Sequence, residues 1–213
     1  MPEPSEPKVK IFLATPLYDG RVHHSYMMGT IQMALEFAGE LIVGKIGSSY
    51  RPQNHDRLTQ AFMQSNATHL LCVNPDIAWT PADARKLLAA DRDFVTGIYG
   101  KKQGEGRPVV PERREGALLE MEYTGAGFML VKRACIERME KAHPELRYDT
   151  QSGPAYALWS PRFAGGVYSE DRTFCSYWRS LGGKIWAHTQ VLLKRHGETV
   201  YAPDAAALRP AGG

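Results

Sequence analysis

Short apolar runs alternate along this chain with stretches whose apolar residues recur at helical spacing. The apolar runs predict strands at 9–14, 41–46, 70–74, 93–99, 118–123, 128–131 and 184–188. The helical spacing predicts helices at 23–39, 54–63, 80–90, 134–141 and 169–181. Because the first five elements read strand, helix, strand, helix, strand, the chain is expected to be an α/β protein built on parallel βαβ units.

The predicted strand at 70–74 is apolar without alternation, which indicates burial on both faces, and it stops at Asn74-Pro75-Asp76. In open α/β sheets, ligands bind at the edge formed by the carboxyl ends of the strands. Asp76 is therefore placed where a carboxylate would handle a metal or a phosphate. The same three residues also suit a simple turn in which Asp76 caps the following segment, and this stretch alone leaves both interpretations open.

Three further spots are expected at the same edge: 15–18, 124–127 and 169–171. Thr15-Pro16 would also end a strand, because proline donates no ladder hydrogen bond. The Gly125-Ala126-Gly127 turn is too short for a phosphate loop and indicates close backbone approach. Glu170 and Asp171 follow a predicted Ser169 N-cap, so they would also complement the helix dipole.

Composition limits the classes of protein that this chain can be. With 213 residues, 43% of them hydrophobic, the chain is expected to form one domain over residues 8–201, between flexible tails at 1–7 and 202–213. A net charge of +3 argues against binding nucleic acid mainly through the protein's field. The three cysteines lack metal-knuckle or disulfide-framework spacing, which fits a reducing, cytoplasmic setting.

No signal peptide or membrane span is recognised, so a soluble protein is expected. Residues 100–116 are rich in Gly, Lys, Arg and Pro and predict an exposed, mobile loop. Its basic residues could instead follow nucleic-acid phosphates: Lys101, Lys102, Arg107, Arg113 and Arg114. The aromatic residues expected near the cleft could stack on a sugar or a base, or pack a loop: Tyr156, Trp159 and Tyr168.

In their order and spacing, the blocks THLLCVNPDIAW, GIYGKK, TGAGFMLVKR, YSEDRTFCSYWRSLGGKIWAHT and RHG resemble a small nucleotide-sugar glycosyltransferase of the GT-A fold. The resemblance spans residues 8–201. It implies a Rossmann-like mixed, mostly parallel sheet flanked by helices, with a short second sheet. It also implies a DxD-type motif and a Mn²⁺ or Mg²⁺ ion that holds the diphosphate of a UDP- or GDP-linked sugar donor.

For the metal, the resemblance implies that Asp76 stands at the last acid of the motif and that His196 completes the coordination. Asn74 occupies the place of the first acid, where an amide keeps a hydrogen bond but loses a charge. Pro75 lies between them in the donor turn. Lys194 and Arg195 are further candidates to offset the charge of the leaving diphosphate.

The remaining donor contacts also follow from the resemblance. Thr15, Pro16 and Tyr18 match the loop that holds the base and the ribose. Arg51, Asp56 and Arg57 match the segment that flanks the base. The turn at Gly125, Ala126 and Gly127 matches the one beneath the donor sugar and the acceptor.

Glu170 and Asp171 match an acidic pair whose carboxylate is the general base of inverting members. Asp171 is the expected base and Glu170 the alternative, and in a retaining enzyme the pair would instead orient the acceptor. The expected function is metal-assisted, inverting sugar transfer to the hydroxyl of a glycan or small molecule. Two other functions stay open: a non-catalytic nucleotide-sugar or carbohydrate-binding module, and transfer to hydroxymethylated bases in DNA.

Overall fold

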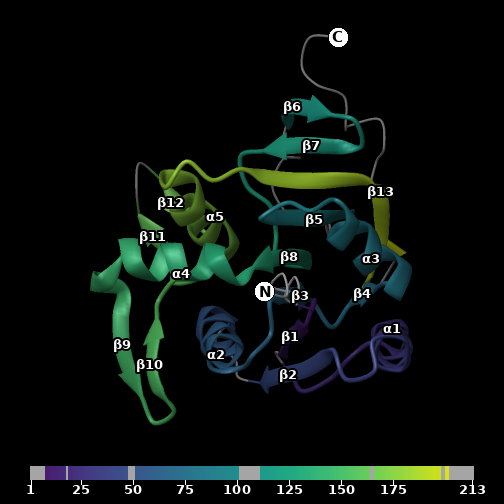
Figure 1. Cartoon of the computed structure of the whole chain (residues 1–213), viewed down its shortest axis with the longest axis horizontal. Coiled ribbons are helices and arrows are strands. Elements are labelled where there is room, and N and C mark those ends of the chain that lie inside the picture. Colours follow the sequence, from purple (N-terminus) through teal and green to yellow (C-terminus); the bar gives the residue numbers. More distant parts are fainter. Residues whose placement is uncertain are drawn as a thin grey trace, which may run out of the picture.

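The computed structural model describes residues 8–17, 19–47, 51–100, 111–163, 166–197 and 200–201. Over this part of the chain the fold is a mixed α/β structure around a ten-stranded sheet, with strand order β2-β1-β3-β8-β5-β13-β7-β6 and with β4 and β14 both paired to β13 (Figure 1). Two small two-stranded sheets, β9 with β10 and β11 with β12, complete it.

The helices are α1 (His24–Glu36), α2 (Arg51–Gln64), α3 (Pro81–Ala89), α4 (Arg133–Ala142), the 3-10 turn η1 (Pro144–Leu146) and α5 (Glu170–Ser180). The strands of the large sheet are β1 (Ile11–Leu17), β2 (Leu41–Gly47), β3 (His69–Val73), β4 (Ile77–Ala78), β5 (Phe94–Tyr99), β6 (Pro111–Glu115), β7 (Leu118–Met121), β8 (Phe128–Lys132), β13 (Ile185–His196) and β14 (Val200–Tyr201). The small strands are β9 (Arg147–Thr150), β10 (Gly153–Tyr156), β11 (Arg162–Phe163) and β12 (Val167–Tyr168). None of these described helices is long and apolar enough to cross a bilayer.

Strand direction decides where the loops meet. Strand β1 is parallel to β2 and β3, as the βαβ pattern predicts, and β13 is parallel to β5. Strand β8 lies between β3 and β5 and is antiparallel to both. Its amino end therefore lies at the carboxyl edge of its neighbours, and the backbone N–H of Asn74 donates to the carbonyl of Gly127 at 3.0 Å.

The helices cover both faces of the sheet because side chains of a strand alternate between faces. On one face, Phe12 and Ala14 belong to a buried cluster that includes residues of α2, α4 and α5. On the other, Ile11 and Leu13 belong to a cluster with residues of α1 and α3. Figure 1 shows the same division, with α2, α4 and α5 to the left of the sheet and α1 and α3 to the right.

Several predicted boundaries differ from the structure. The prediction that the first strand stops at Thr15-Pro16 is wrong, because β1 continues to Leu17. Pro16 is tolerated there since β1 pairs with β3 as far as Ala14, and beyond that residue its one neighbour among the described strands is β2.

Residues 111–115, predicted as loop, form β6, while 101–110 lie outside the described residues. The predicted irregular stretch 143–166 contains η1 and the strands β9, β10 and β11. The last predicted strand, 184–188, is the start of β13, which continues to His196. The predicted tails, 1–7 and 202–213, lie outside the described residues.

Candidate functional site

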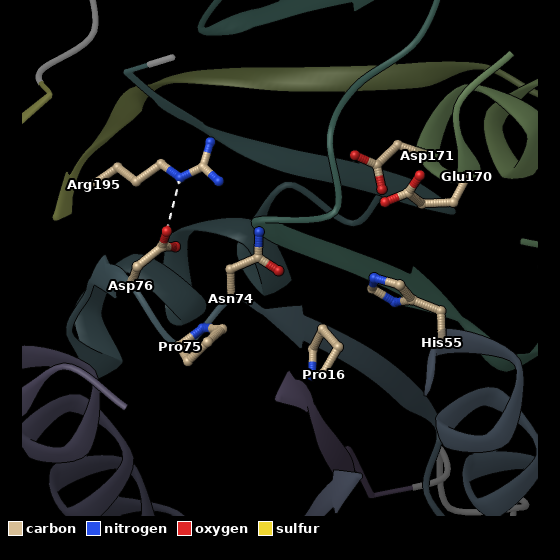
Figure 2. Close-up of a pocket in the computed structure, with 8 residues that line it drawn as sticks. All are labelled: Pro16, His55, Asn74, Pro75, Asp76, Glu170, Asp171 and Arg195. Carbon is tan, nitrogen blue, oxygen red and sulfur yellow. Dashed lines mark hydrogen bonds and ion pairs between the residues drawn. The ribbon is translucent and has the colours of Figure 1, made fainter. Parts of the chain in front are cut away.

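A cavity of about 70 Å³ opens at the carboxyl edge of the sheet (Figure 2). It is lined by Pro16, His55, Asn74, Pro75, Asp76, Glu170, Asp171 and Arg195. These residues come from β1, α2, the β3–β4 turn, α5 and β13, so the fold brings distant parts of the chain together where α/β sheets bind ligands. Pockets for whole ligands usually measure roughly 300–1,000 Å³, so this cavity suits only part of a nucleotide-sized ligand.

The β3–β4 turn carries Asn74, Pro75 and Asp76 and is tied to the end of β13. Arg195 pairs with Ile77 in the antiparallel register of β13 and β4. The backbone N–H of His196 donates to the carbonyl of Asp76 at 2.7 Å. The turn is therefore held by a strand from the far end of the sequence.

Asp76 forms an ion pair inside this cavity. Its Oδ2 accepts from Nε of Arg195 at 3.1 Å, and the two side chains are 23% and 7% exposed. The Arg195 guanidinium also lies 5.9 Å from the centre of the Tyr99 ring, within range of a cation–π contact. The buried guanidinium of Arg195 is thus held at this edge of the sheet by Asp76 and Tyr99.

Tyr99 also explains the glycine turn before β8. A Cβ added at Gly125 would meet the Tyr99 hydroxyl at 2.2 Å, and one at Gly127 would meet the Tyr99 ring at 2.4 Å. The backbone N–H of Gly127 donates to that hydroxyl at 3.0 Å. The predicted close approach at this turn is therefore confirmed, and the approaching group is the phenol of Tyr99. Gly125, Ala126 and Gly127 flank the cavity without lining it.

Glu170 and Asp171 occupy the first turn of α5, whose N-cap is Ser169. The Ser169 side chain accepts from the backbone N–H of Arg172 at 3.5 Å. Both acids line the cavity, and Figure 2 shows their carboxylates directed into it from α5. The Cβ position of Gly125 lies 3.4 Å from Oδ2 of Asp171, so the glycine turn runs beside this carboxylate. Glu170 and Asp171 are thus placed to stabilise the dipole of α5 and also to contact a ligand in the cavity.

His55 is a cavity residue that the sequence interpretation missed. Its ring stacks on Trp159 with centroids 4.3 Å apart, and Trp159 stacks on Phe174 of α5 at 4.0 Å. Trp159 is fully buried, so it packs the loop rather than offering a ligand surface. The only signal in the sequence was the place of His55 beside the predicted base-flanking residues of α2.

Several predicted donor residues do not line the cavity. Thr15 is buried and its hydroxyl is hydrogen-bonded to the hydroxyl of Tyr26 on α1. Arg57 and Lys194 are exposed and do not line this cavity. Tyr18 lies outside the described residues, and for Arg51 only its position in α2 is described.

Asp56 has a structural role beside the cavity. It is 3% exposed and accepts a hydrogen bond from the backbone N–H of Trp159 at 3.1 Å. Burial raises the pKa of the Asp56 carboxyl to about 7, although hydrogen bonds from the backbone of Trp159 and Leu158 act in the opposite direction. Asp56 thus fixes the segment that carries Trp159.

The predicted metal ligand His196 lies against another histidine. Its ring stacks on His23 with centroids 3.8 Å apart and an interplanar angle of 10°. The pKa of His23 is lowered, first by burial and then by the neighbouring His196 and His24. The stacking covers one face of the His196 ring, and His196 is not among the residues that line the cavity with Asp76.

The charge of the cavity still suits a hard cation. Within the described ranges, no three His, Cys, Asp or Glu side chains come close enough together to hold a metal ion on their own. The lining nevertheless has three carboxylates and one guanidinium. A diphosphate would meet net negative charge there unless a cation accompanied it. Asp76 would be the carboxylate that supplies one oxygen ligand to such a cation, whose other ligands would have to come from outside this lining.

The basic stretch is only partly described. Arg113 is ion-paired with Glu115, and Arg114 donates from Nε to the carbonyl of Gly116 at 3.0 Å. Lys101, Lys102 and Arg107 lie outside the described residues.

Comparisons with known proteins inform the fold. No protein-family profile matches the chain, and no curated protein matches it. Among solved structures, A197 from STIV is similar, with a TM-score of 0.58 and 14% sequence identity over 95% of this chain and 97% of that chain. At this identity the likeness shows a shared fold alone. The chain is a mixed α/β protein, and its sheet with helices on both faces is consistent with a Rossmann-like fold.

Proposed function

We propose that this protein is a metal-assisted glycosyltransferase of the GT-A fold, which moves a sugar from a nucleotide-sugar donor to an acceptor hydroxyl with inversion. The observation that carries the proposal is the meeting of the Asn74–Asp76 turn with Glu170 and Asp171 in one cavity at the carboxyl edge of the sheet. The strand order, with β8 antiparallel between β3 and β5, supports the GT-A assignment.

The end of the cavity with Asp76 and Arg195 is assigned to the donor diphosphate. When the C–O bond to the β-phosphate breaks, the electron pair leaves with the nucleoside diphosphate and negative charge develops on it. The guanidinium of Arg195 stabilises this charge in a partly buried site, where electrostatic interactions are strong. A Mn²⁺ or Mg²⁺ ion would be held by Asp76, with His196 as the further candidate ligand, and would supply Lewis-acid stabilisation.

Asp171 is assigned as the general base. Its carboxylate takes the proton of the acceptor hydroxyl while the acceptor oxygen bonds to the anomeric carbon, on the side opposite the leaving diphosphate. Inversion follows from this single displacement. Glu170, in the same helical turn, is the alternative base.

The test is a screen of UDP- and GDP-linked hexoses and pentoses for hydrolysis and transfer, with Mn²⁺, Mg²⁺ or a chelator. Asp171→Asn should bind donor normally and lose about 100-fold or more in turnover, because the amide cannot take the proton. Asp149→Asn is the matched control, since this carboxylate lies on β9 and is 76% exposed. Unchanged turnover in Asp171→Asn would overturn the assignment of the base.

A non-catalytic nucleotide-sugar-binding module is the second candidate. Asn74 in place of an acid and the engagement of Asp76 by Arg195 favour it, because both reduce the negative charge offered to a metal. Donor binding by calorimetry, with neither hydrolysis nor transfer under any metal in the screen, would select this candidate.

A further inference from the structure

The cavity has two chemically different ends. Figure 2 shows Asp76 and Arg195 joined at one end and His55 at the other, with Glu170 and Asp171 directed inward from α5. The first end offers a guanidinium. The second combines an imidazole, which can donate or accept a hydrogen bond, with two carboxylates, which accept from hydroxyls and repel phosphates.

The position of His55 is set by a column of three rings between α2 and α5. The His55 and Trp159 planes differ by 17°, and the Trp159 and Phe174 planes differ by 10°. Phe174 lies one helical turn beyond Glu170 on α5. The column thus links the imidazole on α2 to the helix that carries the two acids.

Hydrogen bonds fix the middle ring of this column. Trp159 donates from Nε1 to Oγ1 of Thr59 at 3.0 Å and from its backbone N–H to Asp56 at 3.1 Å. Both acceptors are buried residues of α2, the helix of His55. One face of the imidazole therefore packs on a rigid support, which fixes the orientation of its ring nitrogens before a ligand binds.

We propose that His55 binds a hydroxyl of the transferred sugar, together with Glu170, and that Trp159 is the positioning residue for this subsite. The inference rests on the proposed function. With the diphosphate at Arg195, the attached sugar extends toward the opposite end of the cavity. Asp171 is then assigned to the acceptor hydroxyl, which leaves His55 and Glu170 to recognise the sugar.

The test compares nucleotides with nucleotide sugars, because the sugar is the group assigned to this subsite, and the different charge of the free β-phosphate is common to wild type and variants. Calorimetry with Mn²⁺ gives dissociation constants for UDP, GDP and a panel of UDP- and GDP-linked hexoses. The gain in affinity from nucleotide to nucleotide sugar is the sugar increment. His55→Ala should lower the increment roughly tenfold, as loss of a ligand hydrogen bond does, and should leave affinity for the nucleotide within about twofold.

Two variants separate binding from a general structural effect. His55→Gln keeps a hydrogen-bonding side chain and should recover part of the increment. His143→Ala is the matched control, because this histidine also contacts an aromatic ring, Tyr177 at 4.6 Å, but does not line the cavity. It should leave both affinities unchanged.

Trp159→Phe keeps an aromatic ring and loses the hydrogen bond to Thr59, so it should reduce the increment. Combined with His55→Ala, it should cause little further loss, since both changes act through one contact. Full additivity would contradict the positioning role. An unchanged increment in His55→Ala overturns the subsite. If no nucleotide and no nucleotide sugar binds the wild type, the proposed function fails and the subsite fails with it.

Discussion

Replacing Asp56 with Asn should stabilise the protein at pH 8 and flatten part of its pH dependence. Asp56 is 3% exposed, and burial raises its pKa from 3.8 to about 7. Asn keeps a carbonyl oxygen that accepts the hydrogen bond from Trp159, which Asp56 accepts at 3.1 Å. The substitution thus removes a buried charge while it preserves the contact.

The sign of this pH dependence follows from the direction in which the pKa of Asp56 is shifted. An acid with a raised folded-state pKa favours folding while it is protonated, so its contribution is full below the unfolded pKa and is lost as the pH rises through the folded value. A pKa of about 7 in the folded state against 3.8 corresponds to about 4 kcal/mol in total, of which about 2–3 kcal/mol is lost between pH 5 and pH 8.

The measurement is the free energy of unfolding in urea at pH 5, 6, 7 and 8, followed by circular dichroism. Three histidines have pKa values lowered first by burial, and their contributions to the pH dependence have the opposite sign: His23, His69 and His188. Because both proteins carry these histidines, their contributions cancel in the difference in unfolding free energy between Asp56→Asn and wild type. This difference should grow with pH by about 2–3 kcal/mol. Asp149→Asn, at an exposed site, should run parallel to wild type. A constant difference between Asp56→Asn and wild type across this range would refute the reasoning.

Three further predictions concern the surroundings of the cavity. Gly125→Ala should destabilise the protein by about 1–3 kcal/mol, because its Cβ would meet the Tyr99 hydroxyl at 2.2 Å. Adding Tyr99→Phe should recover part of this loss of stability, as measured by thermal unfolding. Arg195→Met should cost about 2–4 kcal/mol in urea unfolding, because it leaves the partly buried Asp76 without its guanidinium partner, and an unchanged midpoint would contradict the role of this pair. All three cysteines are free and buried, and burial raises the pKa of Cys175 to about 12. A thiol reagent at pH 8 should therefore label the folded protein slowly. After unfolding, the same reagent should titrate three thiols. Rapid labelling of the folded protein would show that these thiols are accessible.

Part of the candidate site could be predicted from local pattern. The run that became β3 placed Asp76 just beyond a strand, and Ser169 with two acids placed Glu170 and Asp171 in the first turn of a helix. Both predictions depended on residues within a few positions of one another. Neither depended on which strands become neighbours in the sheet.

The residues that sequence reasoning missed or misplaced depend on contacts between distant segments. Tyr99 was predicted only as the end of a strand, yet its phenol packs on the turn before β8 and supports Arg195. Thr15 was expected to face the donor, but its hydroxyl faces Tyr26 on the other side of the sheet. A change of one residue in register moves a side chain to the opposite face of the sheet.

By itself, the sequence determined the alternation of strands and helices, the buried character of β3 and the arrival of acids at the ends of two elements, because periodicity and capping are local properties. Only the tertiary structure decided that β8 runs antiparallel between β3 and β5, that β13 continues far enough to bring Arg195 to Asp76, and that Trp159 supports His55. These pairings join residues far apart in the chain. They are fixed by packing of the whole sheet and its helices, which no local pattern encodes.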